Sequence, residues 1–482
     1  MKLFDKIKLA TSVVETENGD VAYSTTLSYC VDLFGVINAS RNNLKGILDL
    51  FTKAFFENPR LALKILMYSR DVRGGAGERD TFRYIFRYLC LNKSEVARQL
   101  IPFIIEIGRW DDIFVGLQTP VENTVLEIVK AQLEDDLNGL KSNENVSLLS
   151  KWMPSVNTSN RDTVYMGKYL AKKLNMDDAT YRKTLSSLRK GRIIENNLRE
   201  KDYTFNYENV PSLAMHKYVK AFFRNDNERY NEYLSSVNAG EKKINVSTLY
   251  LYDILNEYSV SMSEEEKVAM QVKWDKYSRS ANLGNTIVVR DGSGSMNYSF
   301  DTPSPLNVAN SLSIYFSELL KGEFKNKFIT FSSKPKLVEL KGNSLYEKLT
   351  EVSKYDDYTN TDISKVYDLL LNVYKGEKED IIDRIIIVSD MEFDQGVECE
   401  STFDTFKKKF DKLGVKMPEV IYWNVAARNI HFATHKDQPN IRFVSGASSK
   451  ILDSIIDGKN LSQEDFVKWA VRKYEFIEKI NL

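Results

Sequence analysis

The chain has 482 residues, more than one hydrophobic core normally contains, so we expect about two to four domains. Its 67 basic and 67 acidic side chains balance, which excludes an overall charge that would draw the whole chain to nucleic acid or to an anionic membrane. No apolar run approaches the roughly 18 residues of a membrane span, and charged and polar residues follow Met1 where a secretory signal would have its apolar core. We therefore expect a cytoplasmic protein, or a virion component if the source is viral.

Cysteine and histidine are too sparse to suggest a site for a soft metal. Cys30, Cys90 and Cys399 lie far apart, so neither a disulfide framework nor a zinc knuckle is predicted. His431 and His435 have the i, i+4 spacing of helical zinc ligands, but the segment between them lacks the Glu of a zinc protease. We expect these residues to be ordinary parts of the fold.

Apolar residues recur at helical spacing from about residue 45 to residue 280, as at Leu48, Phe51 and Phe55. Short polar or glycine-containing breaks divide the region, and stacked helical hairpins would bury such a series. No repeat of fixed period is present, so an irregular HEAT-like stack and a plain helical bundle both remain open. The clearest helical segments cover residues 81–91, 96–107, 121–137, 165–174 and 213–223.

The periodicity changes near Leu283, where short apolar and β-branched runs begin to alternate with helical patterns. This alternation predicts a doubly wound parallel sheet with helices on both faces. Expected strands cover residues 285–291, 327–331, 385–388, 420–423 and 441–444, and expected helices begin at Pro305 and cover residues 362–374 and 403–413.

The fold class is therefore multidomain. We expect a HEAT-like helical domain, ring-shaped or open, over residues 1–280 and an α/β domain over residues 281–482. The closing helix, over residues 462–482, has Ser462 as its cap and is expected to pack on either domain.

Side chains that carry oxygen gather where the expected strands end. Asp291, Ser293 and Ser295 follow the first strand, and the glycines between them let the backbone curl around a small ion. Thr361 precedes a helix and Asp390 follows a later strand, so three loops converge at the edge where open α/β sheets bind ligands. Hard oxygen donors select one divalent cation, Mg²⁺ first, with Mn²⁺ and Ca²⁺ as alternatives.

This arrangement resembles the metal-ion-dependent adhesion site of von Willebrand factor A domains, in which Asp-x-Ser-x-Ser follows a buried strand. The resemblance implies that Ser293, Ser295 and Thr361 contact the ion directly. It also implies that the two aspartates act directly or through water, and that an acidic residue of a protein partner completes the coordination. Arg290 departs from the family pattern, since a basic residue stands where the strand is usually apolar, and it predicts a less buried strand end.

Other interpretations of these residues remain open. One is a polar turn with helix caps and strand ends that share no function. Another is a phosphatase or receiver-like phosphotransfer site, which would want a second Asp at position 293, where this chain has Ser. A third is metal-assisted hydrolysis by Asp291 and Asp390, although the motifs supply no general base or nucleophile beside them.

Further motifs are distributed over nearly the whole chain. Thr-Glu-Asn-Gly occurs at residues 16–19, a stretch rich in Arg and Gly at residues 70–80, and Gly-Arg-Trp-Asp-Asp at residues 108–112. Together with Ser-Asp-Met-Glu-Phe-Asp at residues 389–394, they resemble an uncharacterised cellular and viral family related to the Ro-type (TROVE) ribonucleoproteins. That resemblance implies a ring of HEAT-like helices joined to a von Willebrand A domain, and binding of structured small RNA.

One segment has a composition suited to RNA. Between Tyr165 and Tyr203 basic side chains outnumber acidic ones and tyrosines are interleaved, as phosphate contact and base stacking require. A solvated helical face has the same composition, so both interpretations stay open. The candidate RNA-binding residues are Lys168, Lys172, Lys173, Arg182, Lys183, Arg189, Lys190 and Arg192.

The sequence therefore predicts a non-catalytic, Ro-like RNA-binding protein with a metal-dependent docking domain. Its expected partners are a structured small RNA and an acidic residue of a protein, and no membrane. The alternative is a protein-interaction or assembly component, cellular or viral, that uses the metal site without RNA. A metal-assisted hydrolase is the third interpretation.

Overall fold

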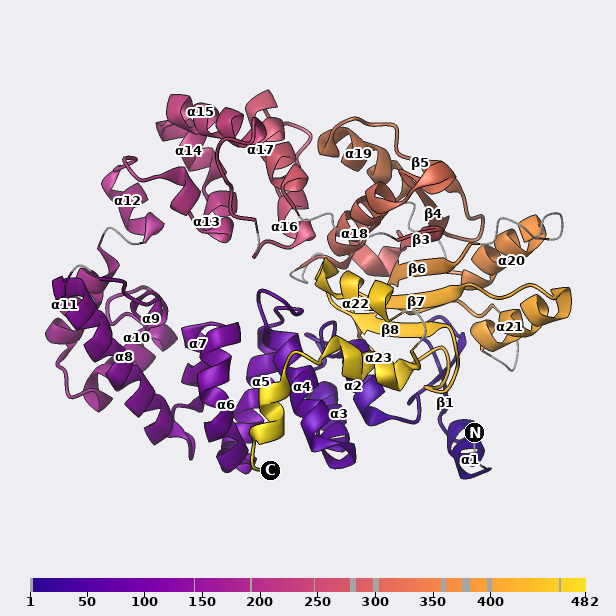
Figure 1. Ribbon diagram of the computed structural model, residues 1–482, viewed down its shortest axis with the longest axis horizontal. Helices are drawn as coiled ribbons and strands as arrows, with labels where there is room; N and C mark the ends of the chain where they lie inside the picture. Colours follow the sequence, from indigo (N-terminus) through magenta and orange to yellow (C-terminus); the bar gives the residue numbers. More distant parts are fainter. Residues whose placement is uncertain are drawn as a thin grey trace. The chain divides into compact units, whose positions relative to one another are not determined.

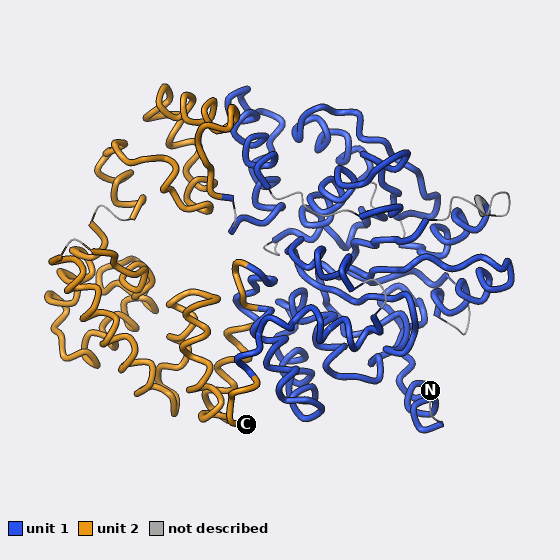
Figure 2. Tube along the Cα trace, viewed as in Figure 1, with its two compact units in different colours: residues 1–69, 74–81, 246–477 blue, residues 70–73, 82–245, 478–482 orange. Residues whose placement is uncertain are grey.

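The protein is described from a computed structural model, and its residues fall into two compact units that each join segments far apart in the sequence (Figure 2). Unit 1 contains residues 1–69, 74–81 and 246–477, and unit 2 contains residues 70–73, 82–245 and 478–482. The boundary expected near residue 280 lies inside unit 1. The structure describes residues 3–142, 144–190, 193–246, 248–277, 283–297, 303–356, 361–374, 382–396, 401–458 and 461–482.

Unit 1 is built around a six-stranded sheet in the order β5-β4-β3-β6-β7-β8 (Figure 1). Neighbouring strands are parallel except that β5 pairs antiparallel with β4. The α/β architecture and the expected strands are confirmed to within one residue at each end, while the short edge strand β5 was not expected. The strands are β3 (Thr286–Asp291), β4 (Lys327–Phe331), β5 (Leu337–Glu339), β6 (Arg384–Ser389), β7 (Glu419–Asn424) and β8 (Ile441–Ser445).

Helices from both ends of the chain cover the sheet. Every residue of β3, β6, β7 and β8 is buried, as in sheets covered by helices on both faces. Helix α18 packs on β3 and β6, and helix α2 packs on β8. The helices that lie mainly in unit 1 are α1 (Leu3–Ala10), α2 (Tyr29–Val36), α3 (Leu44–Glu57), α4 (Pro59–Arg70), α16 (Leu251–Leu255), α17 (Glu264–Asp275), α18 (Pro305–Leu319), α19 (Leu345–Val352), α20 (Ile363–Tyr374), α21 (Thr402–Leu413), α22 (Leu452–Asp457) and α23 (Gln463–Ala470).

The start of the chain also contributes to unit 1. A short antiparallel hairpin joins β1 (Val13–Glu15) to β2 (Val21–Tyr23), and its turn contains residues 16–19. Gly19 forms an isolated β-bridge with Asp394, just beyond β6. The motif at residues 16–19 therefore lies against the end of the central sheet.

The closing helix is shorter than expected. Ser462 caps it as predicted, since its side chain accepts a hydrogen bond from the N–H of Asp465, but α23 ends at Ala470. Val471, Tyr474 and Ile477 are buried at every third position. Three residues is the period of a 3-10 helix, and such a helix follows at Glu475–Lys479.

In the described part of unit 2 every regular element is a helix, as the sequence predicts. The expected segment 213–223 is divided at Tyr218 into two short helices. No helix among the described residues is both long enough and apolar enough to cross a membrane. The helices that lie mainly in unit 2 are α5 (Asp80–Asn92), α6 (Ser94–Ile107), α7 (Trp110–Ile113), α8 (Glu122–Ser142), α9 (Leu149–Trp152), α10 (Arg161–Lys173), α11 (Asp178–Arg189), α12 (Ile194–Glu200), α13 (Ser212–Lys217), α14 (Val219–Asn225) and α15 (Asn227–Asn238).

A buried ion network connects two of the sequence motifs within unit 2. Asp112 is fully buried, and its carboxylate oxygens accept hydrogen bonds from Nε of Arg70 and Nε of Arg83, each at 2.7 Å. The backbone N–H of Arg109 donates to the same carboxylate at 2.8 Å. Paired and hydrogen-bonded charges of this kind stabilise a packed turn, so the Arg-rich and Gly-Arg-Trp-Asp-Asp motifs have a structural role here.

Candidate metal centre

Two aspartates stand where neighbouring parallel strands of unit 1 end. Asp291 is the last residue of β3 and Asp390 directly follows β6, and these strands pair with each other. The chain runs from β3 to β4 on one side of the sheet and from β6 to β7 on the other, so the strand order reverses between them. Open α/β sheets bind ligands at such a reversal, and the structure brings both aspartates to this point.

Asp291 is fully buried, and neighbouring groups fix its carboxylate. Oδ2 accepts a hydrogen bond from the Ser389 hydroxyl at 2.5 Å, and Oδ1 accepts one from the backbone N–H of Ser293 at 2.9 Å. Burial, followed by the negative charge of Asp390, raises the pKa of Asp291 to about 6. The carboxylate is therefore well oriented but unfavourable as an uncompensated anion.

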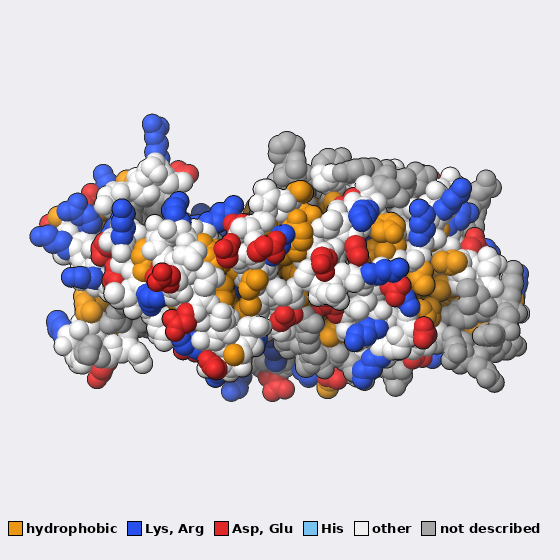
Figure 3. All heavy atoms as spheres, turned by 90° about the horizontal axis from the view of Figure 1, so that it is seen from above, with side chains coloured by type: hydrophobic (Ala, Val, Ile, Leu, Met, Phe, Trp, Pro, Cys, Tyr) orange, Lys and Arg blue, Asp and Glu red, His pale blue; other side chains and the backbone are white. Residues whose placement is uncertain are grey.

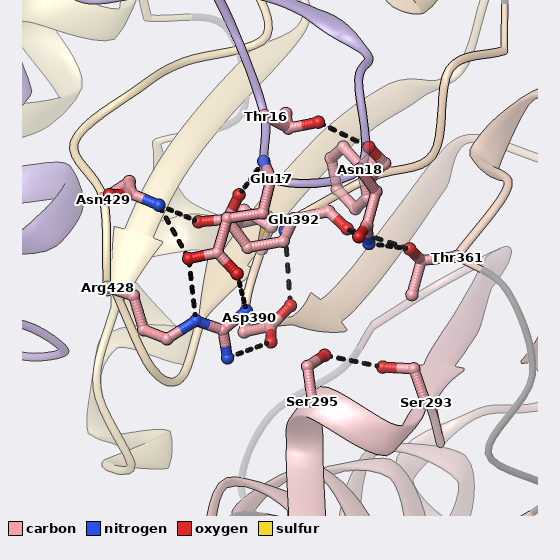
Figure 4. A network of polar contacts seen from close by, with 12 residues as sticks. Thr16, Glu17, Asn18, Ser293, Ser295, Thr361, Asp390, Glu392, Arg428 and Asn429 are labelled. Atoms are coloured by element: carbon pink, nitrogen blue, oxygen red, sulfur yellow. Dashed lines mark hydrogen bonds and ion pairs between the residues drawn. The ribbon is translucent and has the colours of Figure 1, made fainter.

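The two carboxylate oxygens of Asp390 have different surroundings. Oδ1 accepts a hydrogen bond from the backbone N–H of Glu392 at 3.3 Å, whereas Oδ2 is buried and accepts no hydrogen bond from the described residues. Nη1 of Arg428 forms an ion pair with Oδ2 at 3.1 Å (Figure 4). Burial raises the pKa of Asp390, while Arg428 and a hydrogen bond from Ser295 act in the opposite direction. Oδ2 thus has a charged neighbour in Arg428 but accepts no hydrogen bond from the described residues.

The two serines of the Asp-x-Ser-x-Ser motif lie beside each other after β3. Their Oγ atoms are 3.0 Å apart, and Ser295 belongs to a short 3-10 helix at Gly294–Asn297. Gly292 makes this turn possible, because a Cβ at that position would lie only 2.9 Å from the carbonyl oxygen of Tyr355. The turn therefore presents two neighbouring hydroxyls next to Asp291.

Thr361 is buried and already has partners within the chain. Its hydroxyl donates to the carbonyl oxygen of Glu392 at 2.8 Å and lies 3.1 Å from Oδ1 of Asp394. It also accepts a hydrogen bond from Nδ2 of Asn18 at 3.2 Å. Since the N–H of Glu392 binds Asp390, these contacts connect Thr361 to the second aspartate.

This donor set fits a small, hard divalent cation. It contains two adjacent buried carboxylates and three hydroxyls, and Oδ2 of Asp390 is unsatisfied by hydrogen bonds from the described residues. A divalent cation would offset the repulsion between the aspartates, and oxygen donors are the ligands that Mg²⁺ and Ca²⁺ prefer. Among the described residues no three His, Cys, Asp or Glu side chains are grouped as metal ligands, so a cation here would depend on the hydroxyls as well.

Arg290 corrects one expectation about this strand. The sequence predicted a less buried strand end, but Arg290 is fully buried. Its Nε donates to Oδ1 of Asn310 at 2.7 Å, its Nη1 donates to the carbonyl oxygen of Tyr355 at 3.0 Å, and its guanidinium pairs with Asp356. The strand end accepts an arginine because residues distant in the sequence satisfy its charge and its N–H groups.

Residues 16–19 reach the site from the start of the chain, and the sequence did not indicate them as site residues. Asn18 Nδ2 donates to the carbonyl oxygen of Glu392 at 2.6 Å, in addition to its bond to Thr361. The backbone N–H of Glu17 donates to Oε2 of Glu392 at 2.8 Å, and the Glu17 carboxylate pairs with Arg428 (Figure 4). The motifs at 16–19 and 389–394 were visible in the sequence, but nothing in their spacing indicated that they touch.

The histidines and cysteines form no zinc site among the described residues. His431 and His435 lie in a loop rather than on a helix. Nε2 of His431 is 3.3 Å from Oε2 of Glu392, and burial lowers the pKa of His435. Cys30 and Cys90 are free and buried, and Cys399 lies outside the described residues.

The candidate RNA-binding residues lie on α10, on α11 and just after α11. Lys173 pairs with Glu122 at 2.5 Å, and Lys168 pairs with Asp178 at 3.7 Å. Arg192 lies outside the described residues. Basic and acidic side chains are interspersed over the face that Figure 3 shows, in keeping with the zero net charge. The exposed candidates are Lys168, Lys172, Lys173, Arg182, Lys183 and Lys190.

Arg189 differs from the other candidates because its guanidinium donates hydrogen bonds to other residues of unit 2. Nε donates to the carbonyl oxygen of Ser150, Nη2 to that of Met153, and Nη1 to the Ser155 hydroxyl, each at 2.8 Å. Burial lowers the pKa of Arg189. Its contacts fix the chain over residues 150–155, which gives this arginine a structural role that the sequence did not reveal.

Two family models match the chain. The domain of unknown function DUF2828 matches residues 16–95 and 123–286, slightly more than half of the chain. The domain of unknown function DUF7788 matches residues 285–479, which contain the central sheet and the five candidate metal ligands. An uncharacterized protein of Acanthamoeba polyphaga mimivirus is 27% identical over 507 aligned positions, which cover 95% of this chain and 87% of that protein.

Proposed function

We propose that this chain, which belongs to the family of the domain of unknown function DUF2828, is a non-catalytic docking protein with a von Willebrand A-like unit. The observation that carries the proposal is the pair of buried aspartates at the ends of β3 and β6, with one oxygen that accepts no hydrogen bond from the described residues. A divalent cation bound there would supply an open position for an acidic residue of a protein partner. The residues that would hold it are Asp291, Ser293, Ser295, Thr361 and Asp390.

The chain's own groups support this use of the site. Ser389 and the backbone N–H of Ser293 fix the orientation of Asp291, as outer-shell groups do for metal ligands. Ser293 and Ser295 present adjacent hydroxyls from a turn that only glycine at position 292 allows. These contacts would orient Asp291 and the two hydroxyls before a cation arrives, which would lower the entropic cost of binding.

Calorimetric titration of the EDTA-treated full chain with Mn²⁺ and Mg²⁺ tests the proposal. We expect saturable binding of one ion per chain, weakened at least about tenfold by Asp390→Asn, because the variant loses a charged ligand. The matched control is Glu95→Gln, which removes an exposed carboxylate of unit 2. Equal binding by wild type and Asp390→Asn would place the ion elsewhere and overturn the proposal.

A second proposed function is binding of structured small RNA by unit 2, in a HEAT-like, TROVE-related arrangement. The observation in its favour is a group of exposed basic residues on α10 and α11 next to Tyr165, whose ring stacks on Tyr169 and is 59% exposed. Lysines and arginines contact phosphates, and an exposed aromatic face stacks with bases. Retention of RNA on filters across a salt series tests this function. If no RNA is retained at low salt, this second function is overturned and protein docking without RNA is the proposal that stands.

A further inference from the structure

Arg428 bridges a candidate metal ligand and the turn at residues 16–19. It lies in the loop that follows β7, and its side chain is 24% exposed. Nη1 is 3.1 Å from Oδ2 of Asp390, while Nε and Nη2 donate to the two carboxylate oxygens of Glu17 at 3.3 and 2.9 Å (Figure 4). The two carboxylates thus use different nitrogens of one guanidinium.

A cation bound at Oδ2 of Asp390 would compete with Arg428 for this oxygen. The guanidinium lies against Oδ2, the oxygen of Asp390 that has no hydrogen bond from the described residues. A divalent cation that used this oxygen would come close to a positive group in a buried site, where charge repulsion is strong. A cation bound through Oδ2 would therefore have to displace this contact.

The contact with Glu17 does not depend on the one with Asp390. Nδ2 of Asn429 donates to Oε1 of Glu17 at 2.9 Å, and the Glu17 backbone N–H is bound to Glu392. The Glu17 carboxylate is therefore held in place by neighbours other than Arg428. Two parallel hydrogen bonds between a guanidinium and a carboxylate form a strong, directional pair.

We propose that Arg428 is the resident counter-ion of Asp390, which a divalent cation must displace, and that Glu17 retains the guanidinium once it is displaced. This inference rests on the proposed metal site. It makes Arg428 and Glu17 affinity-determining residues rather than ligands: Arg428 lowers the affinity for the cation, and Glu17 lowers the cost of moving Arg428.

A double-mutant cycle on cation affinity tests the inference. Mn²⁺ is titrated into wild type, Arg428→Met, Glu17→Gln and the double variant, with Arg428→Gln as a second neutral substitution in case methionine disturbs the fold. We expect about tenfold or tighter binding by either neutral variant, since a charge within about 4–6 Å changes ionic equilibria by that order. Glu17→Gln should weaken binding in wild type and have little effect beside Arg428→Met.

The outcomes separate this inference from the metal site itself. If wild type binds Mn²⁺ and the neutral Arg428 variants bind no more tightly, the counter-ion role is overturned and the metal site stands. If Glu17→Gln weakens binding equally in wild type and in Arg428→Met, Glu17 acts through its charge alone. Its proposed role in retaining the displaced guanidinium is then overturned. If neither wild type nor the Arg428 variants bind Mn²⁺, the metal site is overturned and this inference with it.

Discussion

Two groups of buried carboxylates, one in each unit, differ in how their charge is compensated. In unit 2, Asp112 lies between Arg70 and Arg83, each at 2.7 Å, so its charge is compensated within the fold. In unit 1, Asp291 and Asp390 repel each other, and Oδ2 of Asp390 accepts no hydrogen bond from the described residues. A carboxylate between two arginines holds a turn together, whereas two adjacent carboxylates beside one arginine, Arg428, cost stability and are characteristic of a binding site.

The largest effect that we expect comes from breaking the compensated network. Asp112→Ala would leave Arg70, itself 2% exposed, without its buried partner, and should lower the free energy of unfolding by about 3–5 kcal/mol. Urea unfolding of the full chain, followed by circular dichroism, measures the change. Glu95→Ala, which breaks an exposed pair with Arg98, is the control and should cost less than about 1 kcal/mol. Equal losses in the two variants would contradict the role given to this network.

The burial of Asp291 beside Asp390 should make stability depend on pH. The pKa of Asp291 is raised from 3.8 to about 6 in the folded protein, so its contribution to stability is present below pH 3.8 and is lost as the pH rises through 6. In EDTA, between pH 4 and pH 7, wild type should therefore lose roughly 2–3 kcal/mol more than Asp291→Asn. Urea unfolding measures the free energy of unfolding of both proteins across this pH range. Parallel pH profiles would show that burial beside Asp390 does not destabilise the charged form of Asp291.

A smaller change in the free energy of unfolding should distinguish arginines with internal hydrogen bonds from exposed arginines within unit 2. Arg189→Ala removes three internal hydrogen bonds from a charged donor and should cost about 1–3 kcal/mol, whereas Arg182→Ala, at an exposed position, should change stability by no more than about 0.5 kcal/mol. Arg189→Lys should not restore the loss, because an ammonium lacks the planar arrangement of donors. Unfolding midpoints in urea measure all three variants. Similar midpoints for Arg189→Ala and Arg182→Ala would show that the internal hydrogen bonds of Arg189 do not stabilise unit 2.

Local sequence patterns account for the strands and for the loop of the candidate site. The runs around Ile287 and Ile386 are short, β-branched and apolar, which is the pattern of buried parallel strands, and both strands lie where the sequence placed them. The Asp-x-Ser-x-Ser motif follows one of them directly. Residues that act together within one turn, or at the end of one strand, are visible in the sequence because local spacing fixes their geometry.

Contacts between distant segments could not be predicted in the same way. Glu17 meets Arg428, 411 positions further along the chain, and Arg290 is satisfied by Asn310 and Tyr355. Each contact depends on tertiary packing, and no periodicity carries information about it. The same limit explains Arg189, since the sequence shows a basic residue on a helix but not whether its guanidinium points inward or outward.

The exposed basic residues give the smallest expected effect on stability and the most direct comparison of the two units. A variant with Lys172, Arg182, Lys183 and Lys190 changed to Ala should unfold within about 0.5 kcal/mol of wild type, apart from small changes in helix propensity. If unit 2 binds RNA, this variant should retain less RNA on filters, and its affinity should depend less steeply on salt because fewer phosphates are contacted.

The matched control removes the same charge from unit 1, at the exposed residues Lys334, Lys336, Lys412 and Lys416. If RNA were held only by general electrostatic attraction, the two variants would lose the same retention, since they have the same net charge. A loss confined to the unit 2 variant would assign the RNA to α10 and α11. Full retention by both variants would remove these helices from the binding surface and leave the candidate metal centre as the proposed ligand site among the described residues.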